Sequence, residues 1–115
     1  MQKNGTNNDE YYVRYEVKSS TIYYGRTLNV ILNAEGNQNK NFTINARTPW
    51  ETVIGPVKKG FVASLTVSEI GDNYGKLTLQ TKIYVNKNAS PFALKRSDES
   101  NTPRTYVQLN YTIDY

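Results

Sequence analysis

Tyrosine is the residue type with which this sequence could most readily build a binding surface. The chain has 10 Tyr, 3 Phe and 1 Trp among its 115 residues. A tyrosine ring supplies apolar contact area while its hydroxyl forms hydrogen bonds, which suits contact with a protein or a glycan. Isolated tyrosines on strands also follow from β propensity alone, so both interpretations stand at this stage. Six tyrosines fall on predicted outward strand faces or in loops and are the candidate ligand or partner contacts: Tyr12, Tyr23, Tyr24, Tyr74, Tyr84 and Tyr106.

Trp50 is the only tryptophan, and it follows Pro49 at a predicted strand edge. Its indole could be a stacking platform for a sugar ring or a lipid. We favour a structural role instead, in which the ring fills the space between two sheets, because large aromatic side chains dominate the energetics of protein cores. The residues predicted to form the structural core are Trp50, Phe61, Leu65, Leu79 and Leu109.

The sequence contains neither Cys nor His. This excludes a thiol nucleophile, a disulfide, an imidazole base and the usual tetrahedral zinc sites. Asp72-Asn73 and Asp98-Glu99 are compact oxygen clusters, but neither has the alternating acidic spacing of a calcium loop. No pair of carboxylates lies in a recognisable acid–base motif. We therefore expect a non-enzymatic protein with no catalytic residue, no metal and no cofactor.

The net charge of +4 comes from 14 Lys and Arg against 10 Asp and Glu. A nucleic-acid-binding surface needs these basic residues gathered on one face or stripe. Here they are scattered, and the densest groups are the pairs Lys58-Lys59 and Lys95-Arg96. We therefore expect no nucleic-acid partner.

The candidate contact and core residues are predicted to lie on β-strands, because apolar and polar residues alternate along most of the chain. Tyr11, Val13, Tyr15 and Val17 alternate with polar neighbours, and a period of two places them on one face of a strand. The same pattern predicts strands over residues 28–34, 42–47, 61–68, 77–85 and 106–113, with a short one over 52–54. No segment of ten or more residues has helical apolar spacing. The chain is therefore predicted to be all-β.

About seven strands with regular turns favour an immunoglobulin-like antiparallel β-sandwich over residues 11–115. A small closed barrel is the alternative, since alternation alone does not separate the two. Residues 1–10 are polar after Met1 and are predicted to form a flexible leader. Residues 86–103 are less regular: Phe92 and Leu94 indicate one short strand, and 97–103 are predicted to be an exposed loop.

Several short motifs occur in an order that resembles one family. They are Val13–Lys18, Asn29–Ala34, Thr48–Glu51, Gly60–Val67 and Ile83–Val85, with Pro49-Trp50 as the most specific pair. Over roughly residues 11–85 the chain resembles the soluble domain of the mycobacterial small membrane proteins (the MmpS family) and related sandwich domains of Bacteroidetes envelope lipoproteins. The resemblance implies the sandwich fold and an extracytoplasmic setting, in the periplasm or at the outer-membrane surface.

The chain departs from the mycobacterial proteins because it has neither their N-terminal membrane helix nor their paired cysteines. Their link to lipid-exporting transporters is therefore not carried over. The polar leader fits a tether after a lipid-modified cysteine in the native precursor, which would be the only membrane attachment. We expect an interaction or accessory module whose partner is an envelope protein or a glycan. A carbohydrate- or lipid-binding domain with an aromatic site is the alternative. Pairing of edge strands between two copies would give a dimer.

Overall fold

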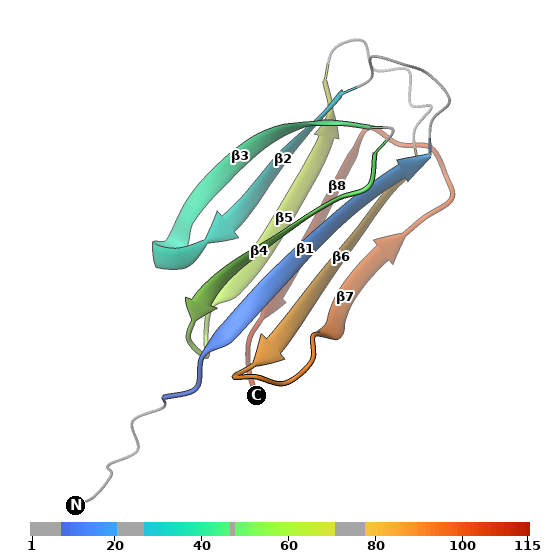
Figure 1. Cartoon of the computed structure of the whole chain (residues 1–115). Helices are drawn as coiled ribbons and strands as arrows, with labels where there is room; N and C mark the ends of the chain where they lie inside the picture. Colours follow the sequence, from blue (N-terminus) through green and yellow to red (C-terminus); the bar gives the residue numbers. More distant parts are fainter. Residues whose placement is uncertain (1–7, 21–26, 47, 71–77) are drawn as a thin grey trace, which may run out of the picture.

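The computed structural model describes residues 8–20, 27–46, 48–70 and 78–115. These residues form two four-stranded antiparallel sheets that pack face to face (Figure 1). The β1 sheet has the order β4-β1-β6-β7, and the β2 sheet has the order β3-β2-β5-β8. The strands are β1 (Tyr11–Ser20), β2 (Thr27–Ala34), β3 (Gln38–Asn45), β4 (Trp50–Val57), β5 (Val62–Glu69), β6 (Thr78–Lys87), β7 (Ala93–Glu99) and β8 (Tyr106–Thr112).

The predicted all-β antiparallel sandwich is confirmed, with eight strands where the sequence indicated about seven. The hairpins β2–β3 and β6–β7 each stay within one sheet, while every other connection passes to the opposite sheet. The strands form two separate sheets and not the closed barrel that was the alternative prediction. The strands also divide four and four, whereas a constant-type immunoglobulin domain divides them four and three.

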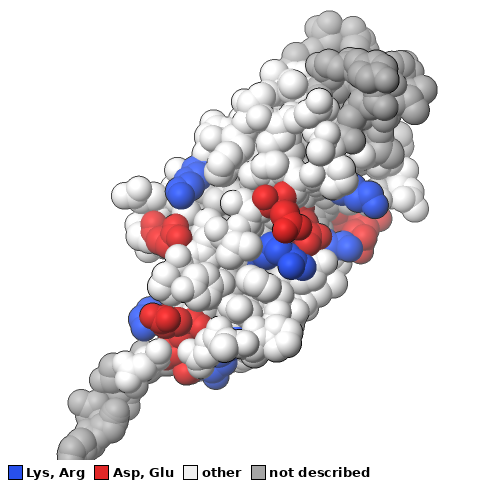
Figure 2. All heavy atoms as spheres, viewed as in Figure 1, with Lys and Arg blue, Asp and Glu red and all other residues white. Residues whose placement is uncertain are grey.

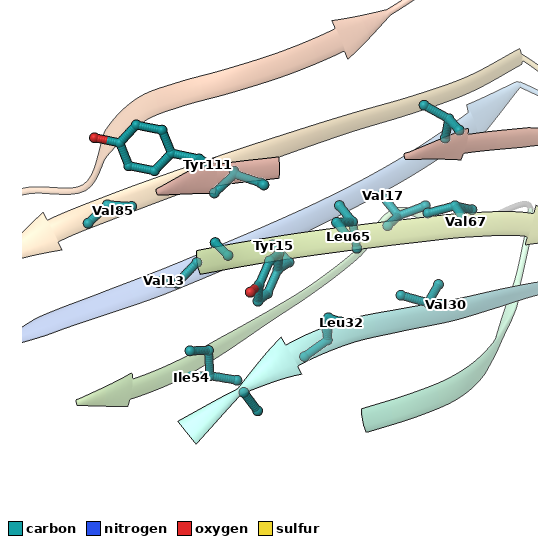
Figure 3. Packing of buried hydrophobic residues seen from close by; sticks show 14 of the residues in the cluster. Val13, Tyr15, Val17, Val30, Leu32, Ile54, Leu65, Val67, Val85 and Tyr111 are labelled. Carbon is teal, nitrogen blue, oxygen red and sulfur yellow. The ribbon is translucent and has the colours of Figure 1, made fainter. Parts of the chain in front are cut away.

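The core lies between the two sheets and is built from the alternating residues that the sequence pattern places inward. Val13, Tyr15 and Val17 of β1 face the side chains of Leu32 and Leu65 from the opposite sheet (Figure 3). All five are buried. Burying such side chains is the main favourable term in folding. Because inward residues alternate without a break in β1, β2, β5 and β6, apolar side chains are buried along the whole length of the sandwich.

The five predicted core residues divide into two groups. Leu65 and Leu79 are fully buried. Phe61, Leu109 and Trp50 are partly buried and pack against the core from its margin. Trp50 is paired with Val17, an inward residue of β1, and packs against the core at the margin between the two sheets, where it is only partly buried. Trp50 begins β4, an edge strand, so no further strand covers it, and its ring rests on Phe42 of β3 with centroids 5.1 Å apart.

Three predicted boundaries are wrong. β4 extends through Gly55-Pro56 to Val57 in place of a short strand over 52–54. β3 begins at Gln38, four residues before the predicted start at residue 42, because the positive φ angles of Gly36 and Asn37 complete the turn after β2 early. β7 includes residues 97–99, which were predicted to belong to a loop. The sequence pattern of β7 does not reveal the whole strand, because β7 is an edge strand with charged residues at inward positions.

The end of the predicted leader is attached to the β6–β7 turn. The backbone N–H of Asn88 donates to the carbonyl of Glu10 at 2.6 Å, and the Glu10 N–H donates to Oδ1 of Asn88 at 3.0 Å. Asp9 forms an ion pair with Lys87 at 3.4 Å. Residues 1–7 of the predicted leader lie outside the described residues. Within the described part of the chain, no helix is long and apolar enough to cross a membrane.

Candidate interaction surface

The structure separates the candidate tyrosines. Tyr12 of β1 and Tyr84 of β6 are partly exposed at outward positions of the β1 sheet, on neighbouring strands. Tyr106 lies on the outer face of the β2 sheet, opposite Ser68, and is 54% exposed. The three described tyrosines therefore do not form a single patch. Tyr23, Tyr24 and Tyr74 lie outside the described residues.

Arg14 organises the outer face of the β1 sheet. Its guanidinium carbon lies 4.2 Å from the ring centroid of Tyr84 and 5.1 Å from that of Phe92. Its Nε atom lies 3.0 Å from a carboxylate oxygen of Glu16. A guanidinium at this distance from a ring is attracted by the negative electrostatic potential of the ring face. Arg14, Tyr84 and Phe92 form the arginine–aromatic cluster.

Two exposed apolar side chains extend this cluster to both edges of the sheet. Arg14 is paired with Val53 of β4 on one side and with Tyr84 on the other, and Tyr84 is paired with Leu94 of β7. Val53 is 47% exposed and Leu94 is 49% exposed. The row across the four strands is thus apolar at both ends, with a cation and an aromatic ring between them. Val53, Leu94 and the arginine–aromatic cluster together form the Arg14 surface.

Of this surface, only Tyr84 was predicted from the sequence as a contact residue. Arg14 and Tyr84 are 70 positions apart in the chain, and only the β1–β6 register places them side by side. Phe92 was interpreted as part of a short strand, but it lies just before β7. The alternating pattern identifies outward positions, but it does not show which of them are neighbours across strands.

A second group of outward side chains continues the same face with alternating charge. Glu16, Lys18, Gln80, Lys82 and Glu99 line a hollow of about 60 Å³. The ammonium of Lys82 lies 3.5 Å from a carboxylate oxygen of Glu99. Electrostatic interaction with Tyr84 and then with Glu99 raises the pKa of Lys82. Figure 2 shows acidic and basic side chains next to one another on this face. The hollow is far smaller than typical ligand pockets of roughly 300–1,000 Å³, so it favours contact between surfaces.

Trp50 lines a larger hollow on the side of the sandwich where β3 and β4 meet. Its volume is about 300 Å³. Thr43, Asn45 and Thr48 contribute polar groups at exposed positions of this hollow. Pro49 and Ile44 complete the lining, and no tyrosine takes part. A partly exposed indole beside hydroxyl and amide groups is chemically suited to one face of a sugar ring.

The acidic pair Asp98-Glu99 does not form a joint oxygen site. Asp98 accepts hydrogen bonds from both terminal nitrogens of Arg104, the shorter at 2.8 Å, and Arg104 also donates to the carbonyl of Leu79 at 2.6 Å. Glu99 instead turns to Lys82 on the outer face. Successive strand residues point to opposite faces, which explains the separation. Asp72-Asn73 lies outside the described residues. In the described part, no group of three or more Asp or Glu side chains is placed to hold a metal ion.

No protein-family model matches this sequence, and no curated protein matches it. The resemblance to the MmpS family therefore stays a prediction. The functional proposals rest on the chemistry of the surfaces themselves.

Proposed function

We propose that this chain is a non-enzymatic interaction module of a bacterial cell envelope, and that the Arg14 surface is where it contacts its partner. The observation that carries the proposal is the row Val53–Arg14–Tyr84–Leu94, which leaves two half-exposed apolar side chains beside an arginine–aromatic cluster. Arginine and tyrosine are enriched at the energetic centres of protein interfaces. Exposed apolar side chains beside them provide area that binding would remove from water.

The charged residues beside the Arg14 surface would give its apolar part a polar border on one side. Glu16, Lys82 and Glu99 have both signs of charge within one small region. Such a border contributes specificity and orientation more than affinity. A protein partner with a complementary apolar patch is the occupant that this surface fits best. The envelope setting, with a lipid anchor on the native precursor, rests on the family resemblance and is part of the same proposal.

The proposal is tested with tagged full-length precursor expressed in its native host. Val53 and Leu94 are both replaced by Ser in one variant, and Val62 is replaced by Ser in the control. Val62 is 44% exposed on the opposite outer face and therefore matches the loss of one of the two apolar side chains. We expect V53S/L94S to lose a copurifying envelope protein that both wild type and V62S retain. Equal loss in both variants, or retention in both, would overturn the proposed surface.

The envelope setting has its own measurement. The precursor is labelled with a fatty-acid probe and the cells are fractionated. We expect label on the protein and recovery in the envelope fraction. Unlabelled protein in the cytoplasm would remove the lipoprotein part of the proposal without affecting the Arg14 surface.

The second candidate function is saccharide binding at the Trp50 hollow. It is favoured by the partly exposed indole next to Thr43, Asn45 and Thr48 in a hollow of about 300 Å³. Because Trp50 is the only tryptophan, its fluorescence emission reports directly on this site. We would titrate the protein with soluble envelope-type oligosaccharides. A saturable shift in emission that Thr48→Val reduces supports the candidate, and an unchanged emission throughout the titration contradicts it.

A further inference from the structure

The sandwich has four edge strands, and they differ in how well further pairing is blocked. Edge strands expose backbone donors and acceptors, and proteins block them with charges, prolines, bulges or inward-pointing charged residues. β4 contains Pro56 and a register shift, and β7 has a register shift with Arg96 and Asp98 at inward positions. β3 carries the exposed Lys40. β8 reads Tyr-Val-Gln-Leu-Asn-Tyr-Thr and has no charge, no proline and no register shift.

The hydrogen bonds around β8 show which of its backbone groups face the open edge. Ile113 donates to the carbonyl of Phe61 at 3.0 Å, and Glu69 donates to the carbonyl of Thr105 at 3.0 Å. Bonds in an antiparallel pair recur at every second residue, so the odd-numbered residues of β8 bond to β5. The backbone groups that face outward belong to the even-numbered residues Tyr106, Gln108, Asn110 and Thr112. Among the described residues, no other strand pairs with this edge.

We propose that a second copy of this chain pairs with β8 in antiparallel fashion, around a two-fold axis at Leu109. This register aligns the whole strand with its copy. It places Gln108 opposite Asn110 of the second copy, and both of these residues have outward-facing backbone groups. The two β2 sheets would then form one continuous sheet across the axis. Because a two-fold contact of this kind is self-complementary and closed, it produces a dimer and no larger assembly.

The sequence of β8 argues for a second copy as the occupant, because the strand is complementary to itself in this register. Each chain carries a net charge of +4, so two copies repel at long range, but β8 itself is neutral and adds no like charges where the two strands meet. Across the axis, Val107 lies opposite Tyr111, an aromatic–β-branched pair of the kind that stabilises antiparallel strands. The register thus brings no like charges together. This self-association is independent of the partner proposed for the Arg14 surface.

The test measures molar mass by sedimentation equilibrium over a range of concentrations. Gln108→Lys places a charge at the edge, and Asn110→Pro removes an outward N–H that β5 does not use. Thr66→Lys is the matched control, since Thr66 is the direct neighbour of Gln108 on the same face but lies in an inner strand. We expect wild type and T66K to pass from monomer to dimer, and Q108K and N110P to dissociate at least tenfold more readily. Thermal unfolding of each variant confirms that it is folded.

Each other outcome contradicts the proposal. If the wild-type chain stays monomeric up to about 1 mM, the β8 edge does not pair with itself to any useful extent, because a dissociation constant of that size corresponds to only about 4 kcal/mol. A dimer that Q108K does not weaken uses another surface. Growth beyond a dimer shows an open contact, such as β8 of one copy pairing with β3 of the next. If N110P fails to fold, Q108K alone decides, because its side chain points into solvent.

Discussion

The outer faces of the two sheets follow the same alternating pattern but carry different chemistry. The β1 sheet presents Arg14, Glu16, Lys82 and Glu99 together with exposed apolar and aromatic side chains. The β2 sheet presents mainly Asn, Ser, Thr and Gln, and the outward positions of β5 and β8 carry no charge. The inward faces of both sheets are mainly apolar, with exceptions such as Arg96 and Asp98 on the edge strand β7. The inward pattern therefore specifies the fold. The outward faces differ in function: the charged and aromatic face of the β1 sheet suits a foreign partner, and the neutral face of the β2 sheet suits a second copy of the chain.

The largest expected effect comes from the close approach of β1 to β4 at Gly55. A Cβ added there would lie 2.7 Å from Cδ2 of Tyr12 and 2.9 Å from the carbonyl of Tyr11, and the φ angle is +139°. Gly55→Ala should lower the free energy of unfolding in urea by about 3 kcal/mol, because strain and overlap both act. Gly36→Ala is the control, with φ of +74° but open space around it. A loss of about 1 kcal/mol is expected there. Equal losses would show that the approach to Tyr12 does not matter.

A smaller effect is expected where one hydrogen bond joins the two sheets. The Tyr15 hydroxyl donates to the carbonyl of Asn33 in β2 at 2.7 Å, and burial raises the pKa of this phenol well above its usual range. Tyr15→Phe should lower the free energy of unfolding by about 1–2 kcal/mol, because a carbonyl loses its partner. Tyr106→Phe, at the exposed tyrosine of the β2 face, should change it by less than about 0.5 kcal/mol. Chemical denaturation of both variants checks the pair, and a reversed order would contradict the placement of Tyr15.

Salt should distinguish the two outer faces. Arg14→Ala removes the contacts with Tyr84 and Glu16, so we expect a loss of roughly 0.5–1 kcal/mol at low ionic strength and less at high salt. Gln108→Ala on the neutral face should be close to zero at every salt concentration. The measurement is urea unfolding at two ionic strengths. If the stability change of Gln108→Ala depended on salt and that of Arg14→Ala did not, the expected difference between the two faces would be contradicted.

The smallest effect concerns the pH dependence of Glu35, which follows β2 and reaches across to β4. Its Oε2 accepts the backbone N–H of Gly55 at 2.7 Å, and this bond lowers the pKa of the carboxyl group. A lowered folded-state pKa means that the contribution to stability is present above the ordinary value of 4.5 and is lost as pH falls through the folded pKa. Thermal unfolding from pH 6 to pH 3 should fall less steeply in Glu35→Gln than in wild type. Identical slopes would show that the bond does not favour the charged form.

Much of the fold could be predicted from the sequence because inward positions repeat every second residue. β1, β2, β5, β6 and β8 were all found in this way. β7 was found only in part, since Arg96 and Asp98 occupy its inward positions, where apolar residues would reveal a strand. The extent of β4 was missed because Gly55-Pro56 resembles the end of a strand. These errors fall on edge strands, which bury only part of their inward face.

The candidate site was less accessible to prediction. Tyr12 and Tyr84 were identified as outward residues, but the role of Arg14 depends on the register between β1 and β6. No short-range signal in the chain specifies that register. The partly exposed position of Trp50 likewise follows from β4 being an edge strand, which only the order of strands reveals. Composition and periodicity thus describe each strand alone, whereas a surface is a property of neighbouring strands.

The most direct test of the Arg14 surface is site-specific photo-crosslinking in the native host. A photoreactive residue replaces Leu94 on the β1 face in one strain and Thr66 on the β2 face in another. We predict that Leu94 gives a crosslink to one envelope protein, that Arg14→Ala weakens it, and that Thr66 gives none to that protein. A crosslink to the same protein from Thr66 but not from Leu94 would contradict the assignment of the β1 face as the contact surface.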